Sequence, residues 1–155
     1  MILPGHVAIA VFCHKLLRQD LVTVVAASVV PDIVDKGLAQ VLRITPSGRY
    51  IMHSIPGCVL AALLVGLIGG KERGYAWALG HFAHLLGDPG FIPWWFPFKQ
   101  YEFSRLKELG EFLYDAFGKD GLRRLAAEMV MLVVALAIPA RKARQKKPAT
   151  GAKEG

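Results

Sequence analysis

The sequence predicts an all-α protein: a compact, membrane-embedded bundle of about five helices, with one further amphipathic helix on its surface. Apolar residues make up 54% of the 155 positions and charged residues 20%, which is more apolar than a typical soluble domain. Formal charge is nearly absent from residues 54–70, 74–98 and 125–140. A helix that crosses a membrane needs about 17–25 mostly apolar residues, and the two central stretches have that length. No alternation of apolar and polar residues indicates strands.

The first two helices are predicted to be short. Residues 4–17 are predicted to form the first helix, with Pro4 in its first turn. Asp20 is placed to cap the second helix, which we expect to end near Val30 because Pro31 disfavours helix in the residue before it. A polar connection with turn-forming residues follows over residues 36–50.

The later helices are predicted from the remaining apolar stretches. We expect helices over about residues 51–68, 75–86 and 122–138, with a tight turn at 71–74. Apolar side chains recur at helical spacing over residues 101–117, with charged residues between them. That pattern predicts the amphipathic surface helix.

The basic charge is concentrated at the end of the chain. The formal net charge is +7, and residues 141–155 hold six basic side chains against one acidic side chain. Residues 1–140 are therefore close to neutral, which argues against a nucleic-acid-binding protein. We expect one membrane-embedded helical domain over residues 1–140 and a basic, disordered tail over residues 141–155.

Seven ionisable residues lie in apolar surroundings, where such groups are costly and usually face an interior or a cavity. They are His6, Asp32, Asp35, His53, His81, His84 and Asp88. Spacings of three and four place His81, His84 and Asp88 on one face of a helix. Imidazole and carboxylate together suit a divalent ion such as zinc, manganese or iron. The alternative is structural, with two histidines bonded to neighbours and Asp88 capping a turn.

The order of the helices predicts where these residues meet. If successive helices alternate in direction, His6, Asp32 and His53 lie at one end of the bundle, and Asp88 returns to the same end. Four separate segments then supply possible ligands to one place. Seven candidates exceed the three or four protein ligands of a catalytic zinc, so either two ions bind or some of these residues support the ligands.

Several short motifs follow one another along the first two thirds of the chain. They are Pro4-Gly5-His6, Pro31-Asp32-Ile33-Val34-Asp35-Lys36, Gly48-Arg49-Tyr50-Ile51-Met52-His53-Ser54, Ala83-His84-Leu85-Leu86-Gly87-Asp88, and Pro93 with the Trp-Phe-Pro stretch to Phe98. Over residues 3–98 the chain thereby resembles the YdjM-type family of predicted membrane-bound metal-dependent hydrolases. The resemblance implies a polar site set of His6, Asp32, Asp35, His53, His84 and Asp88. His81 is not part of that pattern and rests on helical spacing alone.

These observations predict a hydrolase that uses a metal-activated water on an ester or phosphoester. The expected cofactor is one divalent metal ion or more, with zinc preferred. The expected metal ligands are Asp32, His53, His84, Asp88 and His81. The expected catalytic residues are Asp35 or His6 as the base and Arg49, which would hold an anionic substrate.

The predicted location is the cell membrane, with several spans and the tail in the cytoplasm, because basic residues accumulate in cytoplasmic segments close to membrane ends. The expected partners are membrane lipid and a lipid or lipid-linked substrate, with no nucleic acid. Two other functions use the same residues. One is a non-catalytic membrane protein with a structural metal site, and the other is a small ion-coupled transporter with His and Asp as a relay.

Overall fold

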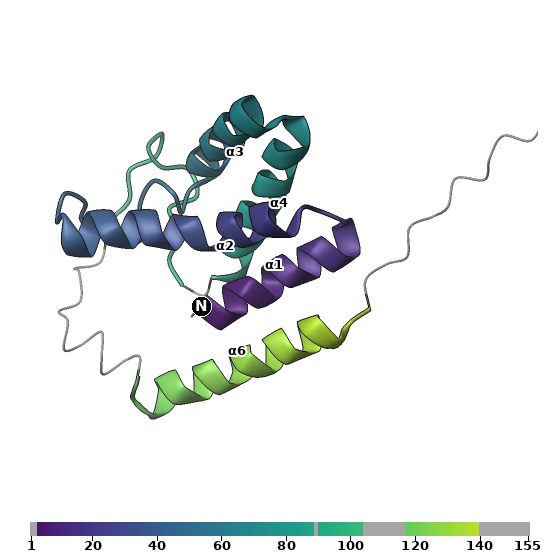
Figure 1. Cartoon of the computed structure of the whole chain (residues 1–155). Coiled ribbons are helices and arrows are strands. Elements are labelled where there is room, and N and C mark those ends of the chain that lie inside the picture. Colours follow the sequence, from purple (N-terminus) through teal and green to yellow (C-terminus); the bar gives the residue numbers. More distant parts are fainter. Residues whose placement is uncertain (1–2, 89, 104–116, 140–155) are drawn as a thin grey trace, which may run out of the picture.

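The computed structural model describes residues 3–88, 90–103 and 117–139, and over these residues it contains helices and no strands (Figure 1). The helices are α1 (Leu3–Leu17), α2 (Leu21–Lys36), the π-helix η1 (Gly37–Val41), α3 (Ile55–Gly69), α4 (Lys71–Gly87) and α6 (Lys119–Ala137). The all-α prediction is therefore confirmed for this part of the chain. The predicted tail over 141–155, and nearly all of the predicted surface helix over 101–117, lie outside the described residues.

Helix α2 is longer than predicted. Asp20 caps it, accepting a hydrogen bond from the backbone N–H of Thr23 at 2.8 Å, but the helix continues through Pro31 to Lys36. The prediction that it ends near Val30 is wrong. A proline inside a helix removes one backbone hydrogen bond, and here the loss is offset by burial, because Pro31 is fully buried on a helix that packs against α4. Asp32 therefore lies on a helix and not in a loop.

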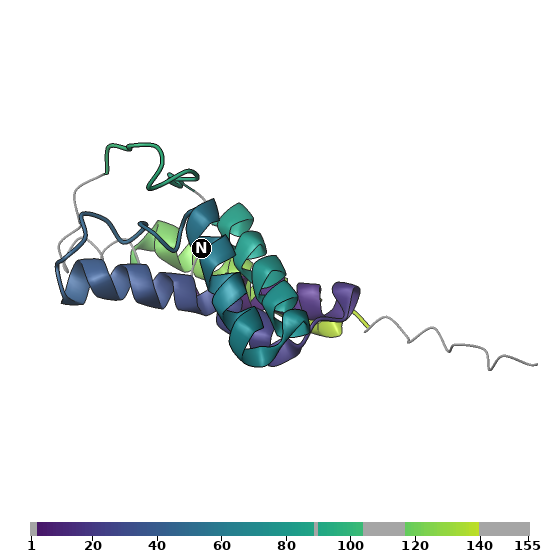
Figure 2. The ribbon, with the colours of Figure 1, turned by 90° about the horizontal axis from the view of Figure 1, so that it is seen from above.

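Helices α3 and α4 form a hairpin (Figures 1 and 2), and Gly70 alone lies between them. Ser54 caps α3 by accepting from the N–H of Gly57 at 3.1 Å, so this helix begins at Ile55 and not at residue 51. Gly70 connects the helices with φ 88°, a conformation that favours glycine. Helix α4 consequently begins at Lys71, and the predicted turn over 71–74 belongs to its first turn.

Two glycines of α4 allow its neighbours to approach closely. A Cβ atom on Gly74 would lie 2.8 Å from the Cα of Gly66 on α3. A Cβ atom on Gly80 would lie 2.9 Å from the carbonyl oxygen of Val24 on α2. Backbone contact of this kind needs small residues at the crossing point, and it fixes where the C-terminal end of α4 lies relative to α2.

Helix α6 packs along α1 (Figure 1), and polar contacts join α6 to both ends of α1. Glu128 accepts a hydrogen bond from the backbone N–H of Gly5 at 3.1 Å, in the first turn of α1. The Lys15 ammonium donates to the carbonyl oxygens of Ala135, Leu136 and Ile138, at 3.0, 2.6 and 2.8 Å. A carboxylate at a helix N-terminus and a cation at a helix C-terminus are both favourable to the helix dipole.

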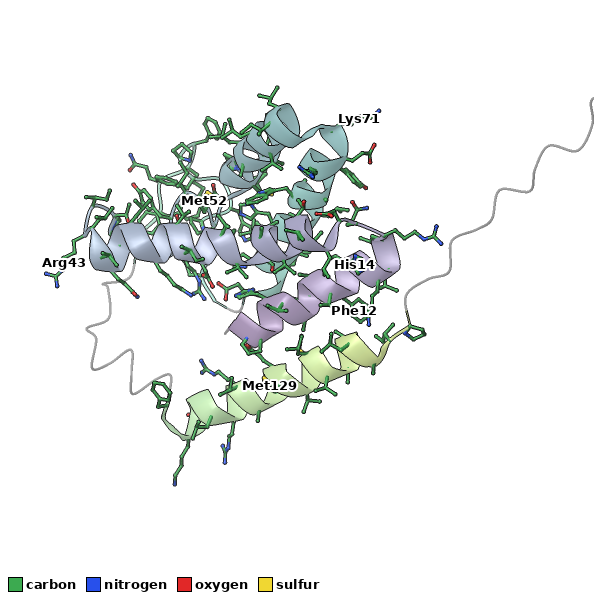
Figure 3. All side chains as sticks on the ribbon, viewed as in Figure 1. Phe12, His14, Arg43, Met52, Lys71 and Met129 are labelled. Carbon is green, nitrogen blue, oxygen red and sulfur yellow. The ribbon has the colours of Figure 1, made fainter. Side chains whose placement is uncertain are left out.

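Several polar side chains of this protein are buried, and many large apolar side chains are exposed. The buried apolar residues are mostly small, among them Ala8, Ala10, Ala27 and Ala76, whereas four histidines are almost completely buried. Large apolar side chains are exposed instead, and Ile68 at the end of α3 is 89% exposed. Figure 3 shows side chains crowded between α2, α4 and the loop with Met52, while α6 projects many side chains away from α1.

No helix in the described ranges combines the length and the apolar character needed to cross a membrane. Helices α3 and α4 are shorter than the apolar stretches from which membrane spans were predicted. Helix α3 has 15 residues, and α4 has 17 and ends at Gly87, before the loop that contains residues 90–103.

Candidate metal centre

Four parts of the chain bring polar side chains to one place. His6 lies in the first turn of α1, Asp32 near the end of α2, His53 directly before α3, and His84 in the last turn of α4. We call these four residues the donor cluster. The three histidines are at most 1% exposed, and the Asp32 side chain is 16% exposed.

Asp35 fixes the orientation of His53. It is completely buried, and its carboxylate accepts hydrogen bonds from the backbone N–H groups of Tyr50, Met52 and His53 at 2.7, 3.2 and 3.1 Å. The same carboxylate lies 2.8 Å from Nδ1 of His53. A carboxylate bonded to the far nitrogen of a histidine fixes the orientation of the ring. Asp35 therefore holds the His53 ring in place through Nδ1.

The His84 ring is fixed in the same way by a backbone carbonyl. Its Nδ1 lies 2.8 Å from the carbonyl oxygen of Ser28 on α2. A carbonyl oxygen only accepts, so Nδ1 of His84 carries the hydrogen. The opposite nitrogen, Nε2, faces Nε2 of His53 at 3.3 Å. Both rings thus turn their second nitrogen toward the same point.

Asp32 and His6 complete the cluster. The two oxygens of Asp32 lie 3.4 Å from Nε2 of His53 and 3.3 Å from Nε2 of His6. The His6 ring stacks on His84 with 4.2 Å between centroids. Both of its nitrogens are buried, and apart from the 3.3 Å approach of Nε2 to Asp32 neither has a hydrogen-bond partner. One ligand atom each from His6, Asp32 and His84 lie within 4.8 Å of one another. A buried imidazole left unsatisfied in this way requires an explanation.

Asp88 and Arg49 lie at the edge of the cluster. An oxygen of Asp88 is 3.8 Å from Nε2 of His53 and accepts from Nε of Arg49 at 2.6 Å. The Arg49 side chain is 34% exposed, whereas that of Asp88 is 3% exposed. Arg49 therefore lies between this carboxylate and the outside of the protein.

His81 does not join the cluster. Its Nε2 donates to the carbonyl oxygen of Met52 at 2.7 Å, and its Nδ1 accepts from the Trp77 indole at 3.3 Å. Both ring nitrogens are thus used by neighbours, which is the structural alternative that the sequence left open for this helix. Of the seven candidates, the structure brings together four as possible ligands, with Asp35 and Asp88 beside them.

The charge states suit a cation. Burial lowers the pKa of His84 to about 3, so the ring is neutral near pH 7 and Nε2 carries a lone pair. Burial raises the pKa of Asp32, but its contacts with His53, His6 and Lys36 outweigh it and hold this pKa well below its usual range. Burial lowers the pKa of His53, but its contacts with Asp32 and Asp35 outweigh that and raise it.

The donor cluster therefore fits a divalent metal ion. Without a metal ion, a proton on Nε2 of His53 must lie between this nitrogen and the lone pair on Nε2 of His84. A metal ion would take the place of this proton and would also use the unsatisfied nitrogen of His6. Three imidazoles and a carboxylate are ligands that zinc accepts readily and that iron and manganese also accept.

Comparison with known proteins supports the resemblance seen in the motifs. The family model described as YdjM inner membrane protein matches residues 2–145. The chain belongs to this family. The YdjM match includes every residue of the donor cluster, and its description supports a location at a membrane. No curated protein and no solved structure matches the chain.

Two contributors to the centre were missed by sequence reasoning. Lys36 contacts Asp32 at 2.9 Å, as an i,i+4 pair on α2. Its spacing would have indicated this contact, had the helix been continued through Pro31. The carbonyl oxygen of Ser28 carries no sequence signal, because any residue at that position presents one.

Proposed function

We propose that this chain is a membrane-bound, metal-dependent hydrolase of an ester or phosphoester. The observation that carries the proposal is the convergence of His53 and His84, each held at Nδ1 and each turning Nε2 to one shared point. Ligand rings held from behind in this way are typical of metal sites. The Asp32 side chain is 16% exposed and is the most exposed of the four in the donor cluster.

In this proposal His6, Asp32, His53 and His84 hold the ion, and zinc suits the set best. When bound, a divalent cation activates water and polarises the ester or phosphoester. Asp35 keeps Nδ1 of His53 protonated, and the Ser28 carbonyl does the same for His84. Asp35 cannot also serve as the base, because its carboxylate is fully used by three backbone N–H groups and His53.

We also propose that the basic tail over 141–155 faces the cytoplasm. Six basic side chains in this segment favour that side, where anionic lipid attracts them by about 1 kcal/mol each. A cysteine placed at Ala149, after replacement of Cys13 and Cys58, should resist a membrane-impermeant thiol reagent in intact cells. Labelling at that position would reverse the orientation.

The metal is tested on detergent-purified protein by elemental analysis. We expect about one zinc, iron or manganese ion per chain, and loss of that ion in His84→Ala. The matched control is His14→Ala, because His14 is half-buried outside the cluster and its Nδ1 lies 2.7 Å from the carbonyl oxygen of Gln19. Equal metal content in the two variants would contradict the assignment.

Turnover is tested on the same samples with a panel of p-nitrophenyl esters and phosphoesters. Activity should disappear with a chelator, return with zinc, and be absent from His84→Ala at unchanged protein concentration. A stoichiometric ion without any turnover across the panel would favour the structural metal site over the hydrolase.

A further inference from the structure

Two cations lie on the outer side of the cluster's carboxylates. Nζ of Lys36 is 2.9 Å from Asp32, and Nε of Arg49 is 2.6 Å from Asp88. The two basic side chains are 42% and 34% exposed, whereas the carboxylates they contact are 16% and 3% exposed. A molecule that approaches the centre from outside therefore meets positive charge first.

The charge balance of the centre changes when an ion binds. The charged side chains described above are the carboxylates Asp32, Asp35 and Asp88 and the cations Lys36 and Arg49. A divalent cation would add two positive charges beside these groups. Uncompensated charge is costly in buried surroundings, so the loaded centre favours an anion.

Lys36 is placed to bind such an anion. Its ammonium has three donors, and the contact with Asp32 uses one. A metal ion on Asp32 would neutralise the charge that now holds Lys36, which frees the ammonium for a ligand. Arg49 offers a planar guanidinium, the side chain best matched to phosphate oxygens.

We infer, on the basis of the proposed function, that the substrate carries a negatively charged phosphate group, which Lys36 and Arg49 bind beside the donor cluster. A neutral carboxylic ester would bring no negative charge to balance the added ion. The phosphate could belong to a lipid headgroup or be a free phosphate, and binding experiments separate these two sources.

The experiment uses calorimetric titration of zinc-loaded protein in detergent. Three probes are compared: dihexanoyl phosphatidic acid, inorganic phosphate, and dihexanoylglycerol, which has the same acyl chains without phosphate. We expect phosphatidic acid to bind about tenfold more tightly than dihexanoylglycerol, equivalent to about 1.4 kcal/mol. Phosphatidic acid binding tighter than inorganic phosphate identifies a lipid headgroup, and equal binding identifies the phosphate alone; both support the inference.

Variants assign the effect to the two cations. Lys36→Gln and Arg49→Gln should each weaken phosphatidic acid binding about tenfold without changing the binding of dihexanoylglycerol. Arg43→Gln is the matched control, because Arg43 is an exposed cation on the same connection and outside the centre. Arg49→Lys keeps the positive charge beside Asp88 and provides a second test should Arg49→Gln fold poorly. It should retain more phosphatidic acid binding than Arg49→Gln.

Zinc content is measured on the samples used for titration, which separates two failures. Wild-type protein that holds no metal would contradict the proposed hydrolase. Wild-type protein that holds zinc and binds the phosphate and phosphate-free lipids equally, or binds none of the three probes, would overturn the phosphate inference alone. Equal weakening by Arg43→Gln would overturn the assignment to Lys36 and Arg49.

Discussion

At the scale of single residues, Asp35 determines how His53 is presented. Its carboxylate accepts three backbone N–H groups and the His53 ring. In Asp35→Asn, an amide NH2 would face these donors. We expect a loss of about 3 kcal/mol or more in unfolding free energy and a metal affinity lower by about 10–100-fold, measured by chemical denaturation and chelator competition.

The control for this prediction is Asp20→Asn. Asp20 accepts from the N–H and hydroxyl of Thr23 at the start of α2. Asparagine caps helices as well as aspartate does, so stability and metal affinity should stay close to wild type. If both variants behaved alike, Asp35 would have no special role behind His53.

Cys58 gives a pH-dependent prediction away from the metal centre. Burial raises the pKa of this thiol from 9.0 to about 11. The folded state therefore keeps the thiol protonated where the unfolded chain ionises, so the stabilising effect is complete below pH 9 and is lost as the pH rises toward 11. Unfolding free energy should fall more steeply in this range for wild type than for Cys58→Ala, by at most about 1.4 kcal/mol per pH unit.

The measurement is denaturant unfolding at several pH values. Between pH 7 and 8 the two proteins should show parallel profiles, because the thiol is protonated in both states there. Identical slopes between pH 9 and 11 would show that the thiol is not shielded from water.

At the scale of helices, the α3–α4 crossing gives a matched pair of glycine substitutions. In Gly74→Ala the new methyl would meet Gly66 Cα at 2.8 Å and Ala62 O at 2.9 Å, whereas in Gly66→Ala the nearest atom would be Gly74 Cα at 3.5 Å. We expect Gly74→Ala to cost about 1–3 kcal/mol. Gly66→Ala should be neutral or stabilising, because alanine favours helix. Thermal unfolding of both variants checks this, and a reversed order would contradict the crossing.

The α1–α6 pair depends on Lys15. Lys15→Met keeps the apolar stem and removes three donors to the last carbonyls of α6. We expect docking of α6 to weaken by about 1–3 kcal/mol, seen as faster amide hydrogen exchange in α6 with α3 and α4 unchanged. Asp120→Asn is the control, because the Asp120–Arg123 pair is more than 80% exposed and such pairs contribute little. Unchanged hydrogen exchange in Lys15→Met would show that the Lys15 hydrogen bonds do not hold α6 against α1.

The boundaries of the helices were predicted less well than their existence, for identifiable reasons. Proline lowers helix propensity, but the burial of Pro31 outweighs that tendency. The start of α3 is delayed to Ile55 because Asp35 takes backbone N–H groups of the preceding residues. Such tertiary contacts leave no trace in local sequence patterns.

At the scale of the whole molecule, the exposed apolar surface agrees with the membrane family. Contiguous exposed apolar side chains mark surfaces that bind a membrane or another protein. On α3 and α6 these include Leu60, Leu63, Leu67, Ile68, Val130, Val133 and Leu136. We expect the protein to remain in the membrane pellet after carbonate washing and to be released by detergent, because so much apolar surface is costly in water.

Cell fractionation followed by immunoblotting tests this, with a cytosolic marker enzyme as the control. Recovery of the chain in the soluble fraction together with that marker would end the membrane assignment.

The position of the centre was predictable because ionisable residues in apolar segments are costly and therefore few. The alternation of helices predicted that His6, Asp32 and His53 lie at one end of the bundle, and in the structure these residues lie together with His84. The roles were harder to predict. His81 and His84 share a helix at adjacent turns, but His81 meets the carbonyl of Met52 and His84 meets that of Ser28. Which nitrogen stays available depends on loops that pack across the helix.

The donor cluster also has a consequence for how the chain reaches its final state. An ion bound by residues as distant as His53 and His84, 31 positions apart, would close chain loops as a cross-link does, and the entropic cost of closing a loop rises only slowly with its length. Every donor precedes residue 89, whereas α6 begins at Lys119. During synthesis the centre can therefore be assembled while α6 is still being made. Helix α6 would then reach an α1 whose first turn is already anchored through His6, and its docking would be the last step of assembly.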